Sequence, residues 1–112
     1  MNAPAEIEIY KALPVAALHS SPTNPRKRFD ETALKQLSES VLNDGVLQPL
    51  VVRPHPRHEG SYEIVAGERR WRAAKLVGLT AVPCVLRMLT DEQVALLQTV
   101  ENLQREDLHP LE

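Results

Sequence analysis

The sequence has a single cysteine, no long apolar run and no recognisable leader, and each shortage excludes a class of protein. Cys84 is the only cysteine in 112 residues, so the chain can form neither an intrachain disulfide nor a multi-thiolate zinc site. The longest apolar runs, at 15–18 and 94–97, have four residues, whereas a membrane-spanning helix needs roughly 20. The first residues lack the basic and apolar regions of a secretory signal. We therefore expect a cytoplasmic protein that does not contact a membrane.

The chain also lacks a strong charge of either sign. Thirteen basic and fifteen acidic side chains leave a net charge of −2, which argues against tight non-specific binding of nucleic acid by this chain alone. With 43% apolar and 25% charged residues, the composition is that of an ordinary globular protein, and the length suits one domain. Any anion-binding site must therefore be local.

Apolar periodicity and turn residues predict an α+β domain with a small mixed sheet of about four strands and three helices. The strands are expected at 14–18, 49–53, 62–66 and 81–86. The helices are expected at 30–43, at 68–77 and from the capping box of Thr90 and Gln93 to just before Pro110. Because residues 1–12 show no clear period, we expect a flexible tail at 1–12 and the domain at 13–112.

Glycine and proline positions predict the connections between these elements. The segment 54–61 is expected to be the turn of a hairpin, and Gly45 and Gly78 to end the first two helices. Pro83 favours an edge position or a bulge for the last strand. The apolar residues expected to face the core are Leu34, Leu37, Val41 and Leu42 in the first helix, Ala73, Ala74 and Leu76 in the second, and Val94, Leu97, Val100 and Leu103 in the third.

The segment 64–74 (IVAGERRWRAA) is the most informative part of the chain. A predicted strand runs into Gly67, and the glycine opens a helix whose first N–H groups lie at the positive end of the helix dipole. Arg69, Arg70 and Arg72 are unfavourable at that end unless an anion offsets them, and guanidinium groups match phosphate oxygens. The pattern favours a phosphate site, with a solvated basic helix face as the alternative. It is not a Walker loop.

The segment 101–105 (ENLQR) places a carboxylate beside an amide near the end of the last helix. Glu101 and Asn102 offer hard oxygen ligands of the kind that Mg²⁺ takes when phosphates complete its coordination. An ion pair on the surface between Glu101 and Arg105 is the alternative. Two proline-containing loops, 22–26 and 45–49, flank the first helix; they suit the recognition of a base edge by main-chain groups, or they simply end the neighbouring elements.

For three further candidates we expect structural rather than functional roles. His55 and His58 lie in a proline-rich turn with no partner at a zinc-site spacing. Cys84 lies in an apolar strand, with no adjacent cation or helix N-terminus to lower its pKa, so we expect an inert core residue. Trp71 is the only tryptophan, and one aromatic residue in a helix usually packs rather than stacks on a base.

Four segments together resemble the N-terminal domain of the ParB family of chromosome and plasmid partition proteins. The segments are 22–26 (PTNPR), 45–53 (GVLQPLVVR), 64–74 and 101–105, which occur in the order and spacing of that family. The resemblance extends from about residue 13 to residue 112. It implies the fold shared with sulfiredoxin and a CTP-dependent DNA clamp that hydrolyses CTP to CDP and phosphate.

The same resemblance implies roles for individual residues. It implies that the triphosphate is held by Gly67, Glu68, Arg69 and Arg70. Glu101 and Asn102 match the residues for Mg²⁺ and phosphate, so Mg²⁺ is the implied cofactor. The acids required for hydrolysis are then Glu68 and Glu101.

Four further residues stand at nucleotide-site positions of the family. Arg26 and Ser40 match directly, and Gln48 is expected to line the cytosine side. Asn24 stands where the family usually has glutamine, so this position departs from the pattern.

The resemblance also implies partners: CTP, a centromere-like DNA site, a partition ATPase of the deviant Walker type, and self-association of N-terminal domains. It implies a protein associated with the nucleoid or a plasmid. The helix-turn-helix domain that reads the DNA site and the C-terminal dimerisation domain are not among these 112 residues. We therefore expect a truncated domain or a short paralogue, in which turnover can be lost.

Two other classes of function stay open on the sequence. One is a sulfiredoxin-like ATP-using phosphotransferase, although Cys84 is in the wrong place for its catalytic cysteine. The other is a module that binds the DNA backbone, or a nuclease, with arginines 69, 70 and 72 on the phosphates. A steep salt dependence of DNA affinity would favour this second reading, and nucleotide-selective binding without DNA would favour the clamp.

Overall fold

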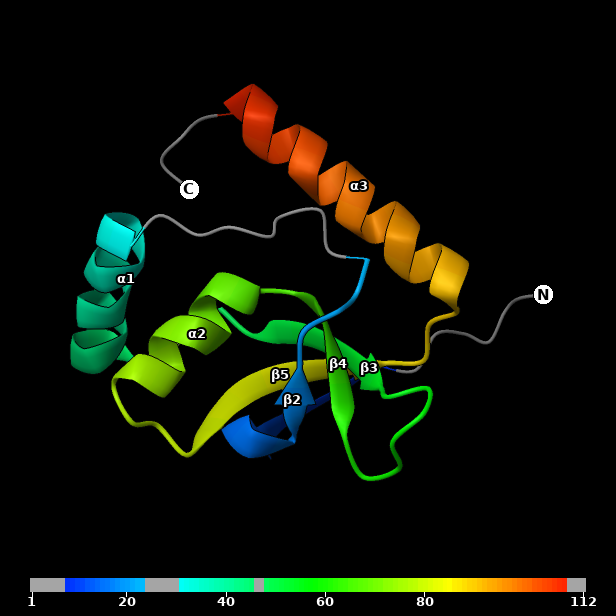
Figure 1. Cartoon of the computed structure of the whole chain (residues 1–112), viewed down its shortest axis with the longest axis horizontal. Helices are drawn as coiled ribbons and strands as arrows, with labels where there is room; N and C mark the ends of the chain where they lie inside the picture. The colour runs from blue at the N-terminus through cyan, green and yellow to red at the C-terminus, as the bar shows by residue number, and fades with distance from the viewer. Residues whose placement is uncertain (1–7, 24–30, 46–47, 109–112) are drawn as a thin grey trace.

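The computed structural model describes residues 8–23, 31–45 and 48–108, with the side chains of residues 44 and 101–108 outside the description. The elements in chain order are β1 (Glu8–Pro14), the 3₁₀ helix η1 (Val15–Ala17), β2 (Leu18–His19), α1 (Glu31–Asp44), β3 (Leu50–Pro54), β4 (Tyr62–Ala66), α2 (Glu68–Leu76), β5 (Ala81–Arg87) and α3 (Asp91–Leu108) (Figure 1). The α+β class is confirmed, and the described part of the chain has one strand more than the four expected.

The sheet is mixed and has the strand order β1-β5-β3-β4-β2. The strands β3 and β4 form the expected antiparallel hairpin, with a register shift between Val51 and Val52. The strand β5 lies parallel to β3 and antiparallel to β1, and the short β2 lies parallel to β4. The central position of β3 and β4 places the end of β4, where α2 begins, in the middle of the molecule.

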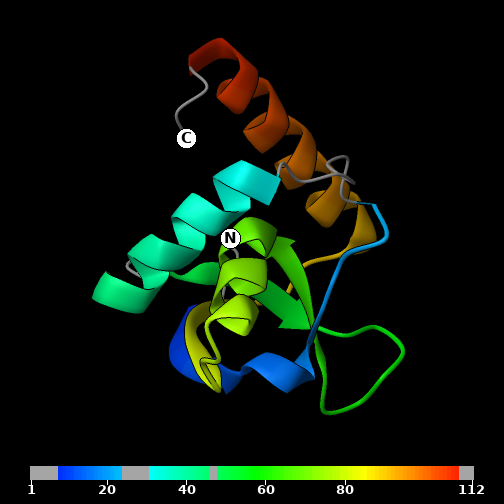
Figure 2. The same cartoon turned by 60° about the vertical axis from the view of Figure 1, so that its left-hand side comes forward.

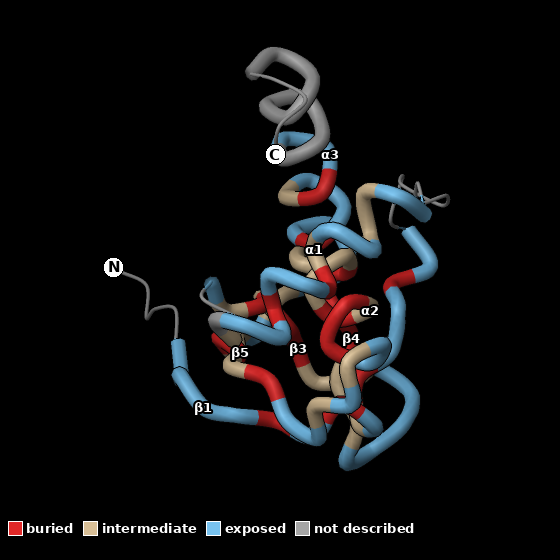
Figure 3. The backbone as a smooth tube through the Cα atoms, turned by 90° about the vertical axis from the view of Figure 1, so that its left-hand side faces the viewer, coloured by how far each residue is buried: buried red, intermediate tan, exposed pale blue. Residues whose placement is uncertain are grey.

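The core lies between the sheet and α2. Its fully buried side chains include Leu50, Val52 and Ile64 from the two central strands. Ala73 and Ala74 have no exposed surface, and their small size lets α2 lie close to the sheet, as the sequence predicts. Figure 3 shows that burial is concentrated in α2 and the inner strands, whereas α1 is mostly exposed.

The expected ends of the helices are confirmed within the described residues, whereas the expected start of the first helix, at residue 30, lies outside them. Gly45 has a φ of 78° and donates its N–H to the Val41 carbonyl, which ends α1. The capping box at the start of α3 is complete: the Gln93 N–H donates to Thr90 Oγ1 at 3.1 Å, and the Thr90 N–H donates to Gln93 Oε1 at 2.9 Å. Among the described residues, none of the helices combines the length and the apolar character needed to cross a bilayer.

The N-terminal expectation was wrong in two respects. Residues 8–12 belong to β1, which pairs with β5 over its whole length, so they are not part of a flexible tail. The expected strand at 14–18 is interrupted by η1, because the Val15 N–H bonds to the Thr80 carbonyl and the Val15 carbonyl accepts a hydrogen bond from Trp71 Nε1. The backbone of Val15 therefore bonds to residues far along the chain instead of taking part in a continuous strand-to-strand ladder.

The expectation for Pro83 was also wrong, because β5 is an interior strand rather than an edge strand. Pro83 is tolerated because the ladder to β3 begins only at Cys84, so the missing N–H of proline interrupts no bond to β3. Of the apolar residues assigned to helix faces whose side chains are described, three are exposed instead: Leu42, Leu76 and Val100. Each lies near the end of its helix or where α3 leaves the sheet. The side chain of Leu103 lies outside the description.

Candidate functional site

Gly67 connects β4 to α2 in a left-handed conformation, with φ 102° and ψ 20°. A Cβ at this position would lie 3.0 Å from Leu50 Cγ and 3.3 Å from Leu50 Cα, so the turn packs directly on β3. The Trp71 N–H donates to the Gly67 carbonyl at 3.1 Å and closes the first turn of α2. The strand–glycine–helix junction predicted from the sequence is therefore confirmed, and it places the N–H groups of residues 68–70 at the positive end of the helix dipole.

The arginines of α2 have different environments. Arg72 Nη2 lies 3.1 Å from Glu68 Oε2, one turn earlier, so this ion pair offsets one of the three positive charges that the dipole disfavours. Arg70 Nη2 donates to Gln48 Oε1 at 2.9 Å. Because Gln48 is neutral, this contact orients the Arg70 guanidinium without neutralising it. Two residues assigned to the nucleotide site, 22 positions apart in the chain, are thus brought together.

Glu68 is buried, with 7% of its surface exposed. Its Oε2 accepts a hydrogen bond from Ser20 Oγ at 2.7 Å and two from the Arg72 guanidinium. Charge-assisted bonds of this kind hold a carboxylate in one orientation. The side chain therefore ties the segment after β2 to the first turn of α2.

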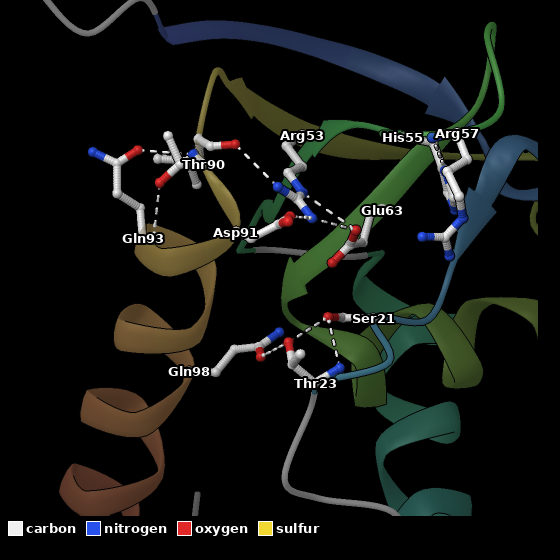
Figure 4. A network of polar contacts seen from close by, with 11 residues as sticks. Ser21, Thr23, Arg53, His55, Arg57, Glu63, Thr90, Asp91, Gln93 and Gln98 are labelled. Carbon is white, nitrogen blue, oxygen red and sulfur yellow. Dashed lines mark hydrogen bonds and ion pairs between the residues drawn. The ribbon is translucent and has the colours of Figure 1, made fainter.

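A second polar connection ties the same segment to α3 (Figure 4). Thr23 Oγ1 donates to Gln98 Oε1 at 2.8 Å, and Gln98 Nε2 donates to the Val65 carbonyl at 3.2 Å. Ser21, which is 2% exposed, lies beside Thr23 with 3.1 Å between the two hydroxyl oxygens. The segment after β2, the end of β4 and the middle of α3 therefore meet in one hydrogen-bonded cluster.

The N-terminal end of α3 is held by a third cluster of polar contacts, centred on Arg53. Arg53 Nη2 lies 2.8 Å from both Glu63 Oε1 and Asp91 Oδ1, and Arg53 Nη1 donates to the Leu89 carbonyl (Figure 4). Burial lowers the pKa of Arg53, but the hydrogen bonds and charges of Glu63 and Asp91 outweigh it, and the pKa is raised. The guanidinium therefore stays charged and anchors the start of α3 to the sheet.

The other residues assigned to the site divide into three groups, according to how far the structure describes them. Ser40 is exposed on α1 and, within the described ranges, is not joined to the first turn of α2 by a hydrogen bond. Asn24 and Arg26 lie outside the described residues, directly after Thr23. Glu101 and Asn102 lie in the helical backbone of α3, and their side chains are outside the description.

Of the candidates given structural roles, Cys84 and Trp71 lie in the core as expected. Cys84 is 1% exposed in β5, and burial raises the pKa of its thiol to about 11. The Trp71 ring packs in the core, with Lys75 Nζ 3.9 Å from its centre. His55 and His58 lie 4.6 Å apart between ring centres, and the described residues contain no group of three or more potential ligands arranged for a metal ion.

A groove of about 580 Å³ lies at the other end of α2. It is lined by side chains of η1, β2, α2 and the turn after α2, among them Val15, Leu18, Trp71, Lys75 and Leu79. It is mainly apolar and does not include Gly67 or the arginines beside it. The groove and the N-terminal end of α2 are therefore separate features.

Sequence reasoning missed the polar residues that join these segments: Ser20, Thr23 and Gln98. The apolar stripe predicted for α3 ran from Val94 through Leu97 and Val100. The structure buries Val94 as predicted, but the next buried residue is Gln98. These two are four residues apart and share one helix face, so the spacing was a usable signal. A polar residue on a buried face requires partners, which only the folded chain identifies.

Comparison with known proteins agrees with this geometry. The model of the ParB N-terminal domain matches residues 2–103. The chromosome-partitioning protein Spo0J of Thermus thermophilus is 53% identical over 100 residues, which are 89% of this chain and 36% of that protein. The chain thus spans about a third of the length of this relative.

Solved structures show the same fold. Truncated ParB of Caulobacter crescentus complexed with CTP-γ-S matches with a TM-score of 0.82 and 47% identity over 88% of this chain and 55% of that one. The same protein complexed to the centromeric parS site matches with a TM-score of 0.77 and 45% identity over 88% of this chain and 50% of that one. Sulfiredoxin of Arabidopsis thaliana shares the fold alone, with a TM-score of 0.61 and 24% identity over 87% of this chain and 98% of that one. The chain belongs to the ParB N-terminal domain family.

Proposed function

We propose that this domain binds CTP at the Gly67 turn and hydrolyses it slowly to CDP and phosphate, as the nucleotide switch of a DNA clamp in chromosome or plasmid segregation. The observation that carries the proposal is the match, over 88% of the chain, to the Caulobacter protein complexed with CTP-γ-S. The geometry supports it, because Gly67 presents a helix N-terminus and Gln48 orients the Arg70 guanidinium beside it.

In this proposal the phosphates lie at the start of α2. The N–H groups of the first turn and the guanidinium groups of Arg69 and Arg70 neutralise the phosphate oxygens. Gln48 lies on the cytosine side, and Asn24, Arg26 and Ser40 complete the nucleotide contacts from the segments around α1. Phosphoryl transfer needs positioning and charge neutralisation more than covalent chemistry, so this set of residues suits the reaction.

Hydrolysis requires water to attack the γ-phosphorus while the bond from that phosphorus to the bridging oxygen breaks, so that CDP leaves with the bridging oxygen. Glu101 and Asn102 fit Mg²⁺ by the chemistry of their donors, a carboxylate and an amide oxygen. Bound Mg²⁺ supplies charge neutralisation on the phosphates. Glu68 and Glu101 are the proposed acids, and Glu68 also holds Ser20, which fixes the segment leading to Asn24 and Arg26.

Partners are proposed for the protein to which this domain contributes. They are a centromere-like DNA site, as in the parS complex of the Caulobacter protein, a partition ATPase of the deviant Walker type, and a second N-terminal domain. Such a protein would be associated with the nucleoid or a plasmid, in keeping with its chromosome-partitioning relatives. Nucleotide binding would act by favouring one arrangement of α3 over another.

The structure argues against the two alternatives. Sulfiredoxin-like chemistry needs a reactive cysteine beside the phosphates, but Cys84 is buried in β5 with a raised thiol pKa. A module for the DNA backbone needs several unneutralised cations, but Arg72 is paired with Glu68 and the net charge is −2. Binding of a nucleotide is therefore the function that the site supports best.

Calorimetric titration with CTP, ATP, GTP and UTP, each with MgCl₂, tests the proposal. We expect binding that is selective for CTP, and Arg69→Ala is expected to abolish it while the circular dichroism spectrum stays unchanged. Arg57→Ala, in the exposed hairpin turn, is the matched control and is expected to bind like the unsubstituted protein. Equal binding of all four nucleotides, or of none, would overturn the proposal.

A further inference from the structure

Gln98 is a buried polar residue on a helix that is otherwise exposed around it. Only 5% of its surface is accessible, while Leu96, Thr99 and Val100 are exposed. Among the described side chains of α3, Gln98 is the last one that is buried. Beyond this point α3 extends away from the sheet (Figures 1 and 2). The position of the second half of α3 therefore depends on how Gln98 is held.

The amide of Gln98 is held from both sides. Its Oε1 accepts from the Thr23 hydroxyl (Figure 4). Its Nε2 donates to the Val65 carbonyl. Thr23 is itself fixed by Ser21, whose hydroxyl accepts the Thr23 N–H at 3.3 Å. A buried amide with a partner for each end has one preferred orientation, because rotation would leave buried polar atoms unsatisfied.

These partners belong to the segments that carry the proposed nucleotide site. Val65 lies two residues before Gly67, and Thr23 lies immediately before Asn24. On α3, Glu101 and Asn102 follow Gln98 by three and four residues, which is the spacing of side chains on one helix face. Fixing Gln98 therefore fixes the rotation of the α3 backbone at the positions of Glu101 and Asn102.

We propose that Gln98 is a positioning residue that sets Glu101 and Asn102 at the Gly67 turn and couples them to the segment before Asn24. This inference rests on the proposed function. The hydrogen bonds of Gln98 to Thr23 and Val65 form the latch, and α3 is the element that it holds. The anchor at Arg53 and Asp91 holds only the start of α3, seven residues earlier. The hydrogen bonds of Gln98 thus fix the second half of α3, which the ion pair of Arg53 with Asp91 does not hold.

The test is the dependence of CTP affinity on Mg²⁺, measured by calorimetry in MgCl₂ and in EDTA. Gln98→Met keeps the length and burial of the side chain but removes both hydrogen bonds. We expect the gain in affinity from Mg²⁺ to fall about tenfold, the effect of one lost hydrogen bond of ordinary strength, while affinity in EDTA changes less than about twofold. A residue that only stabilised the fold would lower the urea midpoint and leave the Mg²⁺ dependence unchanged.

Thr23→Val is the second variant, because Thr23 is exposed and valine has nearly the same shape. It is expected to reduce the Mg²⁺ dependence in the same direction. The double variant is expected to show no further loss relative to Gln98→Met, because that change already removes the Thr23–Gln98 hydrogen bond. Gln36→Met, at an exposed position of α1, is the matched control and should behave like the unsubstituted protein.

The outcomes separate the two proposals. If the unsubstituted protein binds no CTP, the proposed function fails and the latch fails with it. If it binds CTP but Gln98→Met and Thr23→Val retain the full Mg²⁺ dependence, only the latch is overturned. If CTP binds equally in MgCl₂ and EDTA, the positioning of Glu101 and Asn102 for a metal is overturned, whereas CTP binding stands.

Discussion

Arg53 and Glu63 face each other across the β3–β4 hairpin and form a buried ion pair, with 2.8 Å between Arg53 Nη2 and Glu63 Oε1. The side chains are 8% and 2% exposed. Removing one member of such a pair leaves the other charge buried without its partner, which costs about 3–5 kcal/mol. We therefore expect Arg53→Met to lower the free energy of unfolding by that amount, measured by urea denaturation.

Asp91 provides the control for this prediction. It bonds to the same guanidinium, but its side chain is 85% exposed, and exposed ion pairs contribute only about 0–1 kcal/mol. Asp91→Asn should therefore cost less than about 1 kcal/mol. The double variant Arg53→Met/Glu63→Leu should recover most of the loss, because no buried charge remains. An Arg53→Met variant as stable as Asp91→Asn would show that the pair is unimportant.

Gly67→Ala is expected to destabilise the fold and to weaken CTP binding. The φ of 102° disfavours any side chain, and the new methyl group would meet Leu50 at 3.0 Å. Backbone strain and overpacking each cost about 1–3 kcal/mol, so we expect a total loss of at least about 2 kcal/mol in urea denaturation.

Gly60→Ala isolates the backbone contribution. Gly60 also has a positive φ, of 85°, but no atom lies within 4 Å of a Cβ placed there. Its substitution should cost only the strain, about 1 kcal/mol, and should leave CTP affinity unchanged because it lies in the hairpin turn. Equal losses of stability for the two variants would mean that the contact with Leu50 relaxes freely.

The sequence predicted the parts of the fold that local chemistry determines. The hairpin of β3 and β4, the Gly67 junction and the capping box at Thr90 all follow from residues close together in the chain. The first strand did not follow, because most of its side chains are exposed and it is stabilised by pairing with β5, about 70 residues later. Non-local pairing leaves no periodic signal in an exposed edge strand.

In the candidate site, too, the local features could be predicted and the contacts between distant segments could not. The strand–glycine–helix junction at 67–70 could be predicted from one glycine and the residues beside it, because it depends on a single helix end, whereas anion binding there stays a prediction. The ion pair of Glu68 with Arg72 could also have been predicted, because residues four apart lie on the same face of a helix. The contact between Gln48 and Arg70 and the latch at Gln98 could not be predicted from spacing, because each joins segments that only the folded sheet brings together.

Cys84 is expected to be unreactive in the native protein. Burial raises its thiol pKa to about 11, so the reactive thiolate is about 0.1% of the total at pH 8, and the side chain is 1% exposed. Ellman's reagent should therefore modify Cys84 only after the protein is unfolded in urea. Rapid modification at full stoichiometry in buffer would contradict the burial of β5 and reopen a role for the thiol.

His55 is expected to titrate below its ordinary pKa of 6.5. Partial burial is the largest cause of the lowered pKa, followed by repulsion from His58 and Arg57, and Glu63 opposes the shift. His19 adds a small repulsion, and the Arg57 N–H donates to His55 Nδ1 at 3.1 Å, which favours the neutral ring. Titration of the imidazole proton signals by NMR measures this pKa directly.

The sign of the effect on stability follows from linkage. Below pH 6.5 the unfolded chain protonates His55 before the folded chain does, so the free energy of unfolding contributed by this group falls as the pH decreases from 6.5 to the lowered folded pKa. Above 6.5 the contribution is complete and constant. His58→Asn removes one repulsive charge and should raise the pKa of His55 toward 6.5, whereas Lys35→Gln on α1 should not move it. A His55 pKa at or above 6.5 in the unsubstituted protein would contradict the arrangement of this turn.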